Sequence, residues 1–599
     1  MPNKRIRRWV LVLALFTLIA ASCGDDDTTT AAAPTTQAAT PTSVVDTGTT
    51  EAPADEDESA PATTAAATTA APATTDAPDA PLTGREGTVI IGKQMFGDTT
   101  FDPSVAFAEL HVMVFGSVYN HLLSWGETEN GYDYQTLAPE LATQWFSNPE
   151  ATQWTFKLDT DAHFHDGTPV EAADVKWSYE RFINKAGPPS YLAAGIASIE
   201  APDAQTVVFN LSGPDAEFPG LTTANNLAIL NSELVIANGG SAEADAAETD
   251  TAEEWLTLNS AGSGPFKIDV SDPGTRLELV RVEDYWAGPP AAMERVIVTD
   301  IPESQSRIAA LAQGDIDLSW TVIPHQAATL GQDYTILQAN TNHWYYVAFT
   351  ADPANNAFVA NPTVQQALKY AIDYEGLQNL CPGFPALRAY GLAPQRLGGI
   401  TDGYHEDLDK ARALLAEAGY PDGWNSGVEG YDPIRLQTFQ WTGFCPIFGD
   451  VTQKLAQDWG RIGVTTDVQI RDAGVFFTDF RSGDLDINVS DWFPDYPSAV
   501  SSAAVSFPGG VLAGRARWDA NGDTWPGYSE IKALGEQTLA AVDPAERIRL
   551  LNETETLSLE YSPIHLLTEV PEWYPHVNTL TGVYYHAIYR FEPYRMGRS

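Results

Sequence analysis

Helical and strand-like patterns of apolar residues alternate along the chain from about residue 86 to its end. Apolar positions recur at helical spacing over 361–372, 407–418 and 451–462. The first of these segments opens with Asn-Pro, an N-cap followed by proline at the first helical position, and the second stops at Gly419. Directly after the third, apolar and polar residues alternate over 464–470, as they do in a strand. Such helix–glycine–strand connections predict a mixed α/β fold.

Two stretches lack the large apolar residues that a packed core needs. Residues 23–85 consist mostly of Thr, Ala, Pro and acidic residues, so burial cannot offset the entropy of ordering them. We expect a disordered tether there, extended by its proline and acidic residues. The shorter stretch 239–254 is small and acidic, which predicts a surface insertion.

The first 22 residues are typical of a secretory signal. Four basic residues precede the apolar run 9–21, which is too short to cross a membrane. The run ends in Ile-Ala-Ala-Ser before Cys23, which resembles a bacterial lipobox except that Ala20 stands where Leu is usual. The resemblance implies a diacylated Cys23 that anchors the chain to the cell membrane. The alternative is an ordinary signal peptide that is cut nearby.

Charge and composition exclude several classes of function. The formal net charge of -47 comes from 80 acidic against 33 basic residues, and phosphate backbones would repel it, so no nucleic-acid partner is expected. With 44% hydrophobic residues in 599, the chain can bury a large core in several structural units. In an exported protein Cys381 and Cys445 are candidates for one disulfide, and two unpaired buried thiols are the alternative.

Short motifs with the residue types of metal or phosphate sites have simpler explanations. His163 and His165 alternate in the run His-Phe-His-Asp, but two histidines without a third ligand make a poor metal site. We expect a strand there that ends in an Asp-Gly turn. Residues 262–265, Gly-Ser-Gly-Pro, lack the Lys-Ser/Thr of a phosphate loop and predict a tight turn. With no catalytic motif elsewhere, we expect no enzyme, no metal and no cofactor.

Five segments in order resemble the family 5 extracellular solute-binding proteins, which are oligopeptide and dipeptide receptors of ABC importers. Residues 154–158 and 163–175, with Trp-Thr-Phe-Lys-Leu and His-Phe-His-Asp-Gly-Thr-Pro-Val, are similar to the family signature. Residues 262–266 are similar to its Gly-Thr-Gly-Pro-Tyr turn, and residues 309–317 are similar to its Ala-Leu-x-x-Gly-Glu-x-Asp segment. Residues 361–373 are similar to its Asn-Pro helix, and residues 411–420 are similar to its Leu-Leu-x-x-Ala-Gly-Tyr helix.

The resemblance implies an α/β clamshell of two lobes, of the type II periplasmic-binding-protein kind, with an extra subdomain in the first lobe. Lobe I would take residues 86–338, including the subdomain at about 133–258, and lobe II would take 339–565. Residues 566–599 would return to lobe I. Closure of such lobes about a hinge encloses the ligand, and we expect the protein to be a monomer.

The same resemblance supplies candidate ligand-binding residues. Residues 491–497 read Asp-Trp-Phe-Pro-Asp-Tyr-Pro and match the family's Trp-x-x-Asp-Tyr segment, in which the aspartate pairs with the α-amino group of a peptide. This implies that Asp495 binds the amine and that the aromatic residues Trp492, Phe493 and Tyr496 form walls. The alternative is that Asp495 only caps the loop. Phe439 and Trp441 lie at a predicted strand end and either face the cleft or belong to the core.

These observations together predict an extracytoplasmic, lipid-anchored solute-binding component of an ABC transporter. It would capture a small solute, a peptide first of all, and deliver it to a membrane permease. An oligosaccharide, a metal chelate or an opine are alternative ligands for the same fold. A tethered secreted hydrolase and a sensory receptor are alternatives of other classes.

Overall fold

The computed structural model describes residues 86–599 apart from 96–99, 107–108, 130, 340, 442–443 and 589. All of these residues belong to one compact unit, Pro78–Ser599. The expected signal segment, Cys23 and the tether lie outside the described residues. Within the described part of the chain, no helix is long and apolar enough to cross a bilayer.

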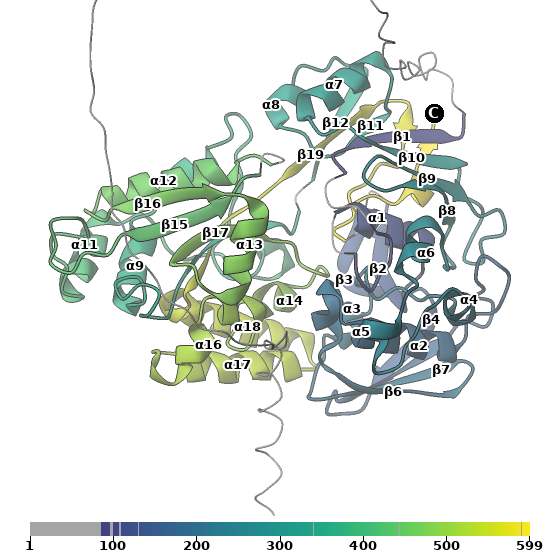
Figure 1. The fold of residues 1–599 in the computed structure, drawn as a ribbon, viewed down its shortest axis with the longest axis horizontal. Coiled ribbons are helices and arrows are strands. Elements are labelled where there is room, and N and C mark those ends of the chain that lie inside the picture. The colour runs from purple at the N-terminus through teal and green to yellow at the C-terminus, as the bar shows by residue number, and fades with distance from the viewer. Residues whose placement is uncertain are drawn as a thin grey trace, which may run out of the picture. The chain divides into compact units, whose positions relative to one another are not determined.

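Lobe I is built on a seven-stranded mixed sheet at the right of Figure 1. The central strand of this sheet pairs in parallel with the strands on both sides. An antiparallel hairpin forms one edge, and the strand at the other edge pairs antiparallel with a strand that is distant in sequence. The strands in order across the sheet are β12 (Tyr334–Ala339), β19 (Glu572–Val577), β11 (Leu318–Ser319), β1 (Thr88–Lys93), β10 (Arg295–Asp300), β9 (Arg276–Arg281) and β8 (Phe266–Asp272). The helices of this part are α1 (Glu109–Val118), α6 (Glu253–Leu258), α7 (Ser304–Gln313) and α8 (Pro324–Ala327).

A four-stranded antiparallel sheet with its own core forms the extra subdomain of lobe I. Phe156, Phe209, Tyr179 and Phe182 are buried between this sheet and helix α2 (Ala172–Lys185). The strands in order are β4 (Ala142–Ser147), β5 (Gln153–Leu158), β7 (Thr206–Leu211) and β6 (Ile196–Asp203), and the hairpin β2 (Leu123–Thr128) with β3 (Gly131–Pro139) precedes them. The short helices are η1 (Pro188–Ala193), α3 (Phe218–Leu221), α4 (Ser232–Ala237) and α5 (Ala246–Thr249).

The stretch 239–254 is not a simple surface insertion, contrary to the sequence prediction. Asp250 is buried and bonds the guanidinium of Arg181 at 2.8 and 3.0 Å, and Asp102 bonds the same guanidinium at 2.8 and 2.6 Å. A guanidinium as deeply buried as this one needs compensating carboxylates. The stretch therefore holds one of the two anions on which the subdomain depends.

The segment 163–166 also differs from the expected strand. His163 makes only an isolated bridge to Pro169, while β5 ends at Leu158. The two histidine rings lie against backbone carbonyls, His163 beside Asp161 and Asp284 and His165 at 2.9 Å from the carbonyl of Gly264. Each ring is thus held by the turns that surround it.

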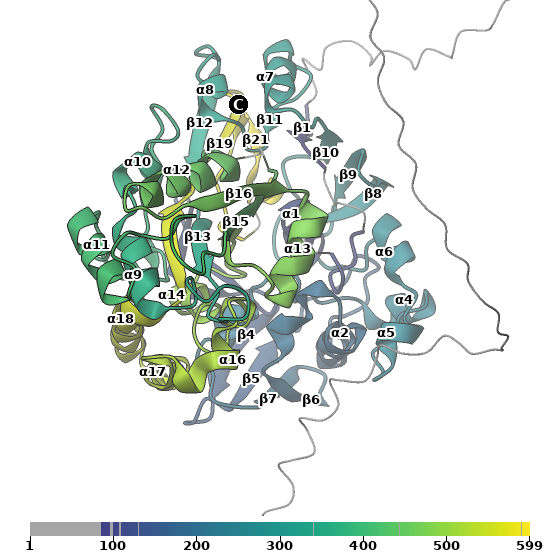
Figure 2. The same ribbon diagram turned by 60° about the vertical axis from the view of Figure 1, so that its left-hand side comes forward.

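Lobe II is built on a six-stranded mixed sheet, covered by helices that Figures 1 and 2 show in two groups, α9, α11 and α12 in one and α16 to α18 in the other. The strands in order are β14 (Leu387–Arg388), β18 (Ile564–Glu569), β13 (Trp344–Phe349), β17 (Ile487–Trp492), β15 (Ile434–Phe439) and β16 (Thr466–Arg471). The helices are α9 (Pro362–Tyr370), α10 (Tyr374–Gln378), η2 (Gln395–Leu397), α11 (Leu408–Glu417), α12 (Phe448–Gly460), α13 (Ala473–Ser482), α14 (Ala499–Ala504), α15 (Val511–Arg515), α16 (Trp518–Asn521), η3 (Gly522–Thr524), α17 (Tyr528–Ala540) and α18 (Pro544–Tyr561).

Local signals in the sequence place the ends of the lobe II helices. The side chain of Asn361 accepts a hydrogen bond from the backbone of Thr363 and begins α9, and Asp407 caps α11 through the backbone of Lys410. Gly419, with φ of +95°, follows α11 in the left-handed conformation that favours glycine. These three predicted boundaries are confirmed.

The chain crosses between the lobes twice. β12 ends in lobe I at Ala339 and β13 begins in lobe II at Trp344, while β18 and β19 make the return crossing between Glu569 and Glu572. The two crossings bond each other, since the hydroxyl of Thr341 donates to the carbonyl of Val570 at 2.6 Å. After β19 the C-terminal residues stay with lobe I and include β20 (Leu580–Thr581), η4 (Pro593–Arg595) and β21 (Gly597–Arg598).

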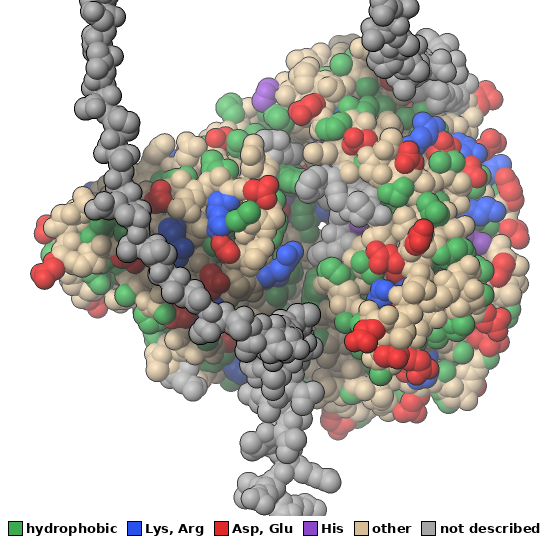
Figure 3. All heavy atoms as spheres, in the orientation of Figure 1, with side chains coloured by type: hydrophobic (Ala, Val, Ile, Leu, Met, Phe, Trp, Pro, Cys, Tyr) green, Lys and Arg blue, Asp and Glu red, His purple; other side chains and the backbone are tan. Residues whose placement is uncertain are grey.

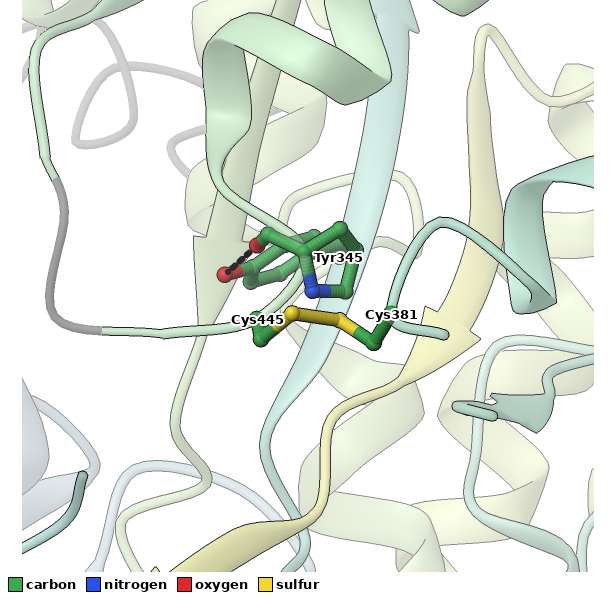
Figure 4. Close-up of a disulfide and its surroundings, with 4 residues drawn as sticks. Tyr345, Cys381 and Cys445 are labelled. Atoms are coloured by element: carbon green, nitrogen blue, oxygen red, sulfur yellow. Dashed lines mark hydrogen bonds between the residues drawn. A yellow bond between two sulfur atoms is a disulfide. The ribbon is translucent and has the colours of Figure 1, made fainter. Parts of the chain in front are cut away.

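A disulfide joins Cys381 and Cys445 in lobe II (Figure 4). It links two loops 64 residues apart in sequence, the second of which leads into α12. The hydroxyl of Tyr345, from β13, donates to the carbonyl of Pro446 at 3.1 Å, which Figure 4 marks with a dashed line. The loop before α12 is therefore held both by the disulfide and by the central sheet.

Candidate functional site

The candidate ligand loop, residues 491–497, leaves the C-terminal end of β17 at the junction of the lobes. β17 lies between β13 and β15 in the middle of the lobe II sheet, so the loop emerges from the most strongly held part of the lobe. Ser498 then caps α14 by accepting from the backbone of Val500. A rigid strand and a capped helix thus fix both ends of the loop.

Asp495 faces lobe I and contacts it directly. The hydroxyl of Tyr191, in η1 of the subdomain, donates to the carboxylate of Asp495 at 2.6 Å. Asp495 is half-buried, and desolvation raises its pKa to about 6 although the Tyr191 hydrogen bond opposes this shift. Among the residues that the structure describes, no cation offsets this rise in the pKa, so the carboxylate would gain from a positively charged partner.

Phe493 lies in an aromatic stack that also joins the lobes. Its ring is parallel to the imidazole of His343, with centroids 3.7 Å apart and an interplanar angle of 12°. The guanidinium of Arg590, from the C-terminal segment of lobe I, lies 4.3 Å from the Phe493 ring. His343 in turn lies 2.8 Å from Asp491, through Nε2 and Oδ2. Phe493 thus lies against the imidazole ring of His343 on one contact and the guanidinium of Arg590 on the other.

Tyr496 is packed between the two lobes and does not line an open ligand site. It is buried with Trp125 and Ile588 of lobe I. A Cβ added to Gly220 would lie 3.2 Å from its ring, so the close approach of α3 depends on glycine at that position. The sequence predicted Tyr496 as a ligand wall, and the structure places it in lobe-to-lobe packing.

Of the remaining aromatic residues predicted to bind the ligand, some lie in the core of lobe II and others lie near the candidate ligand loop. Phe439 is buried, and its ring centroid lies 4.6 Å from that of Phe448 and 4.9 Å from that of Phe477, so it belongs to the core of lobe II. Trp441 is half-buried and lies 6.3 Å from Phe444, the ring that also contacts Phe493. Trp492 is likewise half-buried and packs against the lobe II core. Of the two alternatives for Phe439, the structure supports the core.

A second lobe contact lies next to the candidate loop, where α3 and α14 approach each other (Figure 1). Glu217 pairs with Arg547 of α18 at 2.8 Å and also accepts from the hydroxyl of Ser498. The backbone of Ala216 donates to Leu539 at 3.0 Å. A cavity of about 300 Å³ lies here between the two lobes, with walls that include Trp125, Tyr134, Trp145, Leu397 and Pro497.

A comparison with known families decides what kind of protein this is. The bacterial extracellular solute-binding proteins, family 5 (middle region), match residues 136–510, more than half of the chain. The chain belongs to this family.

Two proteins that are similar to this solute-binding protein match most of its folded part. The probable D,D-dipeptide-binding periplasmic protein DdpA of Escherichia coli (strain K12) is 26% identical over 496 residues, which are 81% of this chain and 89% of the relative. Among solved structures, the ABC transporter-associated periplasmic binding protein DppA from Helicobacter pylori, in complex with the peptide STSA, has a TM-score of 0.69 at 21% identity. The match covers 86% of this chain and 98% of that one.

A third comparison shows that the fold takes ligands of more than one chemistry. AgaA from A. tumefacien R10, in complex with agropinic acid, has a TM-score of 0.67 at 24% identity and covers 86% of this chain and 99% of that chain. These comparisons confirm the expected two-lobed α/β architecture of this solute-binding protein.

Several residues at the junction could not be found from the sequence of the solute-binding protein. Tyr191 stands in an unremarkable run, Pro-Pro-Ser-Tyr-Leu-Ala, and meets Asp495 across 304 positions. His343 and Arg590 likewise reach Phe493 from distant segments. Only the Trp-x-x-Asp-Tyr segment carried a local signal, because its residues are adjacent in the chain.

Proposed function

We propose that this solute-binding protein captures a small solute with a protonated amine, a peptide in the first place, between its two lobes. It then delivers the solute to an ABC permease without chemical change. The observation that carries the proposal is the half-buried carboxylate of Asp495, which faces the opposite lobe and has no cationic partner among the described residues.

An ammonium group is the partner that this carboxylate lacks. Burial disfavours the charged form of Asp495, and a charge-assisted hydrogen bond from an ammonium would restore it. Tyr191 occupies one oxygen of the carboxylate, Oδ1, so Oδ2 is left for the amine. The names of the relatives support a peptide, since DdpA is described as dipeptide-binding and DppA was solved with a peptide.

Binding measurements on Asp495 variants test this proposal. Asp495→Asn keeps an acceptor for Tyr191 but removes the charge, and we expect it to weaken binding of a free dipeptide by more than tenfold in calorimetry. Asp484→Asn is the control, because Asp484 is exposed and pairs only with Arg517 and Ser482. Equal affinity of the wild type and Asp495→Asn for a dipeptide would remove Asp495 from the amine-binding role.

We further propose that the mature chain is held at the outer face of the cell membrane by lipid on Cys23. The basic residues, the short apolar run and the small residues before Cys23 support this, together with the acidic tether that follows. Metabolic labelling with a fatty acid should mark the wild type and leave Cys23→Ser unlabelled. An unlabelled wild type whose N-terminus lies elsewhere would contradict the anchor.

Delivery to a permease is tested in cells. Deleting the gene should abolish uptake of a labelled dipeptide, and the wild-type gene but not Asp495→Asn should restore it. Normal uptake in the deletion strain would contradict the transport role and favour the alternative of a sensory receptor.

A further inference from the structure

The backbone of His343 is tied into the hinge between the lobes. His343 stands in the first crossing, directly before β13, and its amide donates to the hydroxyl of Thr341 at 3.0 Å. Its carbonyl accepts from the amide of Val570, in the second crossing, at 2.9 Å. Thr341 donates to the carbonyl of Val570 in turn. These bonds join the two crossings at one point, so the backbone of His343 moves with the hinge.

The side chain of the same residue contacts the candidate ligand loop, residues 491–497, at two positions. Nε2 of His343 lies 2.8 Å from Oδ2 of Asp491, where the loop begins. The imidazole stacks on the ring of Phe493 with centroids 3.7 Å apart. The side chain of His343 is fully buried, so water does not compete for these contacts. His343 therefore connects the hinge to the loop that carries Asp495.

The hydrogen bond between His343 and Asp491 is specific for both groups. An ionised carboxylate only accepts hydrogen bonds, so Nε2 carries the proton and donates it. Nδ1 is buried and meets no donor among the described residues. The Asp491 side chain is 19% exposed and, in the described part of the chain, bonds no other side chain. The donor and the carboxylate thus each have one side-chain partner, and losing either group leaves the other without one.

Other contacts of the candidate ligand loop reach lobe I. Asp495 bonds the hydroxyl of Tyr191, and the guanidinium of Arg590 lies over the ring of Phe493. Such contacts are lost when the two lobes move apart. The contact with His343 differs, because β13 and β17 pair side by side within the sheet of lobe II. It is therefore the contact that keeps the loop in place in an open form.

We propose that His343 is a positioning residue for solute binding, which acts through Asp491 and Phe493. It holds the candidate ligand loop at the hinge, so that Asp495 is in place before the amine of the solute arrives. This role rests on the proposed function and deepens it. A loop that is already ordered loses less conformational entropy on binding, so the solute binds more tightly although His343 does not touch it.

Two substitutions separate the hydrogen bond from the ring. His343→Gln places an amide donor near the position of Nε2, whereas His343→Phe keeps a ring for Phe493 and has no donor. In hydrogen exchange of the unliganded proteins, followed by mass spectrometry, the amides of 490–496 should exchange about fivefold faster in His343→Phe than in the wild type. His343→Gln should stay close to the wild type. His405→Phe is the matched control, because His405 lies 3.0 Å from Asp402 in the same lobe with both side chains exposed.

Calorimetry then measures whether the held loop matters for binding. The probe is the member of a panel of free dipeptides that most raises the unfolding temperature of the wild type. His343→Phe should bind it about tenfold more weakly than the wild type does, and His343→Gln should restore most of the affinity. Asp491→Ala removes the other partner of the bond and should weaken binding to a similar extent. The double variant of Asp491→Ala and His343→Phe should be little weaker than either one, because both break the same bond.

Failure of the positioning role can be told apart from failure of the proposed function. Unchanged exchange in His343→Phe, or faster exchange with unchanged affinity, would overturn the positioning role while peptide binding stands. Equal losses of affinity in His343→Phe and His343→Gln would overturn it too, because the donor would then not be what matters. If His343→Phe does not fold, Asp491→Ala decides in the same two measurements. A wild type that binds no dipeptide of the panel would contradict the proposed function, and the positioning role with it.

Discussion

The charge that Asp495 needs for binding an ammonium group is opposed by its burial. A carboxylate that is to attract an ammonium must stay charged, yet the half-buried position raises its pKa to about 6. In the unliganded protein the neutral form is therefore favoured relative to the unfolded chain, where the pKa is ordinary. The charged form is destabilising until an amine arrives, so part of the affinity comes from relieving this cost.

Solute binding should accordingly weaken in acid. As the pH falls through about 6, Asp495 takes up a proton and loses its attraction for an ammonium group, whereas the amine of a dipeptide stays protonated. We expect the dissociation constant of a dipeptide to rise about tenfold between pH 7.5 and pH 5, measured by calorimetry. A constant affinity over this range, with the protein still folded, would show that Asp495 does not hold the amine as a carboxylate.

Removing the charge should stabilise the unliganded fold. The folded pKa of Asp495 is raised, so the folded state binds the proton more tightly than the unfolded state does, and the free energy of unfolding falls as the pH rises from 4 to 6. At pH 7.5 Asp495→Asn should therefore be more stable than the wild type, by at most about 3 kcal/mol. The difference should shrink by roughly half at pH 5. Thermal unfolding at the two pH values measures it, and an Asn variant that is less stable at pH 7.5 would contradict the burial argument.

At the scale of elements, the buried Arg181 network ties helix α2 to two distant segments. Asp102 and Asp250 both bond Arg181, whose side chain is fully buried. Asp250 also pairs with Lys185 at 3.4 Å, so without it Asp102 alone would compensate two cations. Breaking a buried ion pair in this way costs about 3–5 kcal/mol. We expect Asp250→Asn to lower the unfolding temperature of the protein by several degrees, whereas Glu248→Gln, at an exposed position of the same stretch, should change it little. Equal stability of the two variants would show that the network is not needed.

Sequence patterns predicted elements where the signal is local. Asn361 and Asp407 cap helices through backbone groups two or three residues away, and Gly419 needs only its own backbone freedom, so each could be read from its neighbours. Asp250 was misjudged because its partner Arg181 is 69 positions away and no composition rule reveals it. The family resemblance predicts Asp495 as a ligand-binding residue from its own segment. Its hydrogen-bond partner Tyr191 lies 304 positions away, so only the folded structure reveals that contact.

At the scale of the whole molecule, two of the contacts between the lobes differ in their chemistry. One includes Asp495 and Tyr191 and would change when a solute binds. The other joins Glu217 to Arg547 and Ser498, and it contains no candidate ligand residue. We expect this second contact to favour closure of the lobes before and after binding, because closed and open forms differ in whether the ion pair is made.

Breaking the second contact should shift the molecule toward an open form. Arg547→Gln removes the charge that pairs with Glu217, both side chains being largely buried, at 15% and 11% exposure. We expect a larger radius of gyration of the unliganded protein in small-angle X-ray scattering, and a several-fold weaker affinity for solute because closure is less favourable. Arg549→Gln on the same helix, where an exposed arginine pairs only within α18, is the control. Scattering curves that coincide for all three proteins would contradict a role in closure.

The strongly acidic surface affects which macromolecules can approach the protein, and it does not identify the ligand. Acidic side chains gather over α5 on the face that Figure 3 shows, and the formal net charge is -47. Such a charge keeps a protein soluble and repels other anions at long range. The desolvated carboxylate of Asp495, by contrast, acts on its neighbours at short range.

In the proposed function, the two lobes enclose a solute whose amine is held by Asp495. Native mass spectrometry of the protein, purified from its own cells without ligand exchange, would identify this solute. We expect the wild type to carry one or more peptides with a free amino terminus, released on unfolding and identified by their fragments, and we expect Asp495→Asn prepared in the same way to carry none. A sugar, a metal chelate or another solute without an amine in the wild type, or the same peptide load in both proteins, would contradict it.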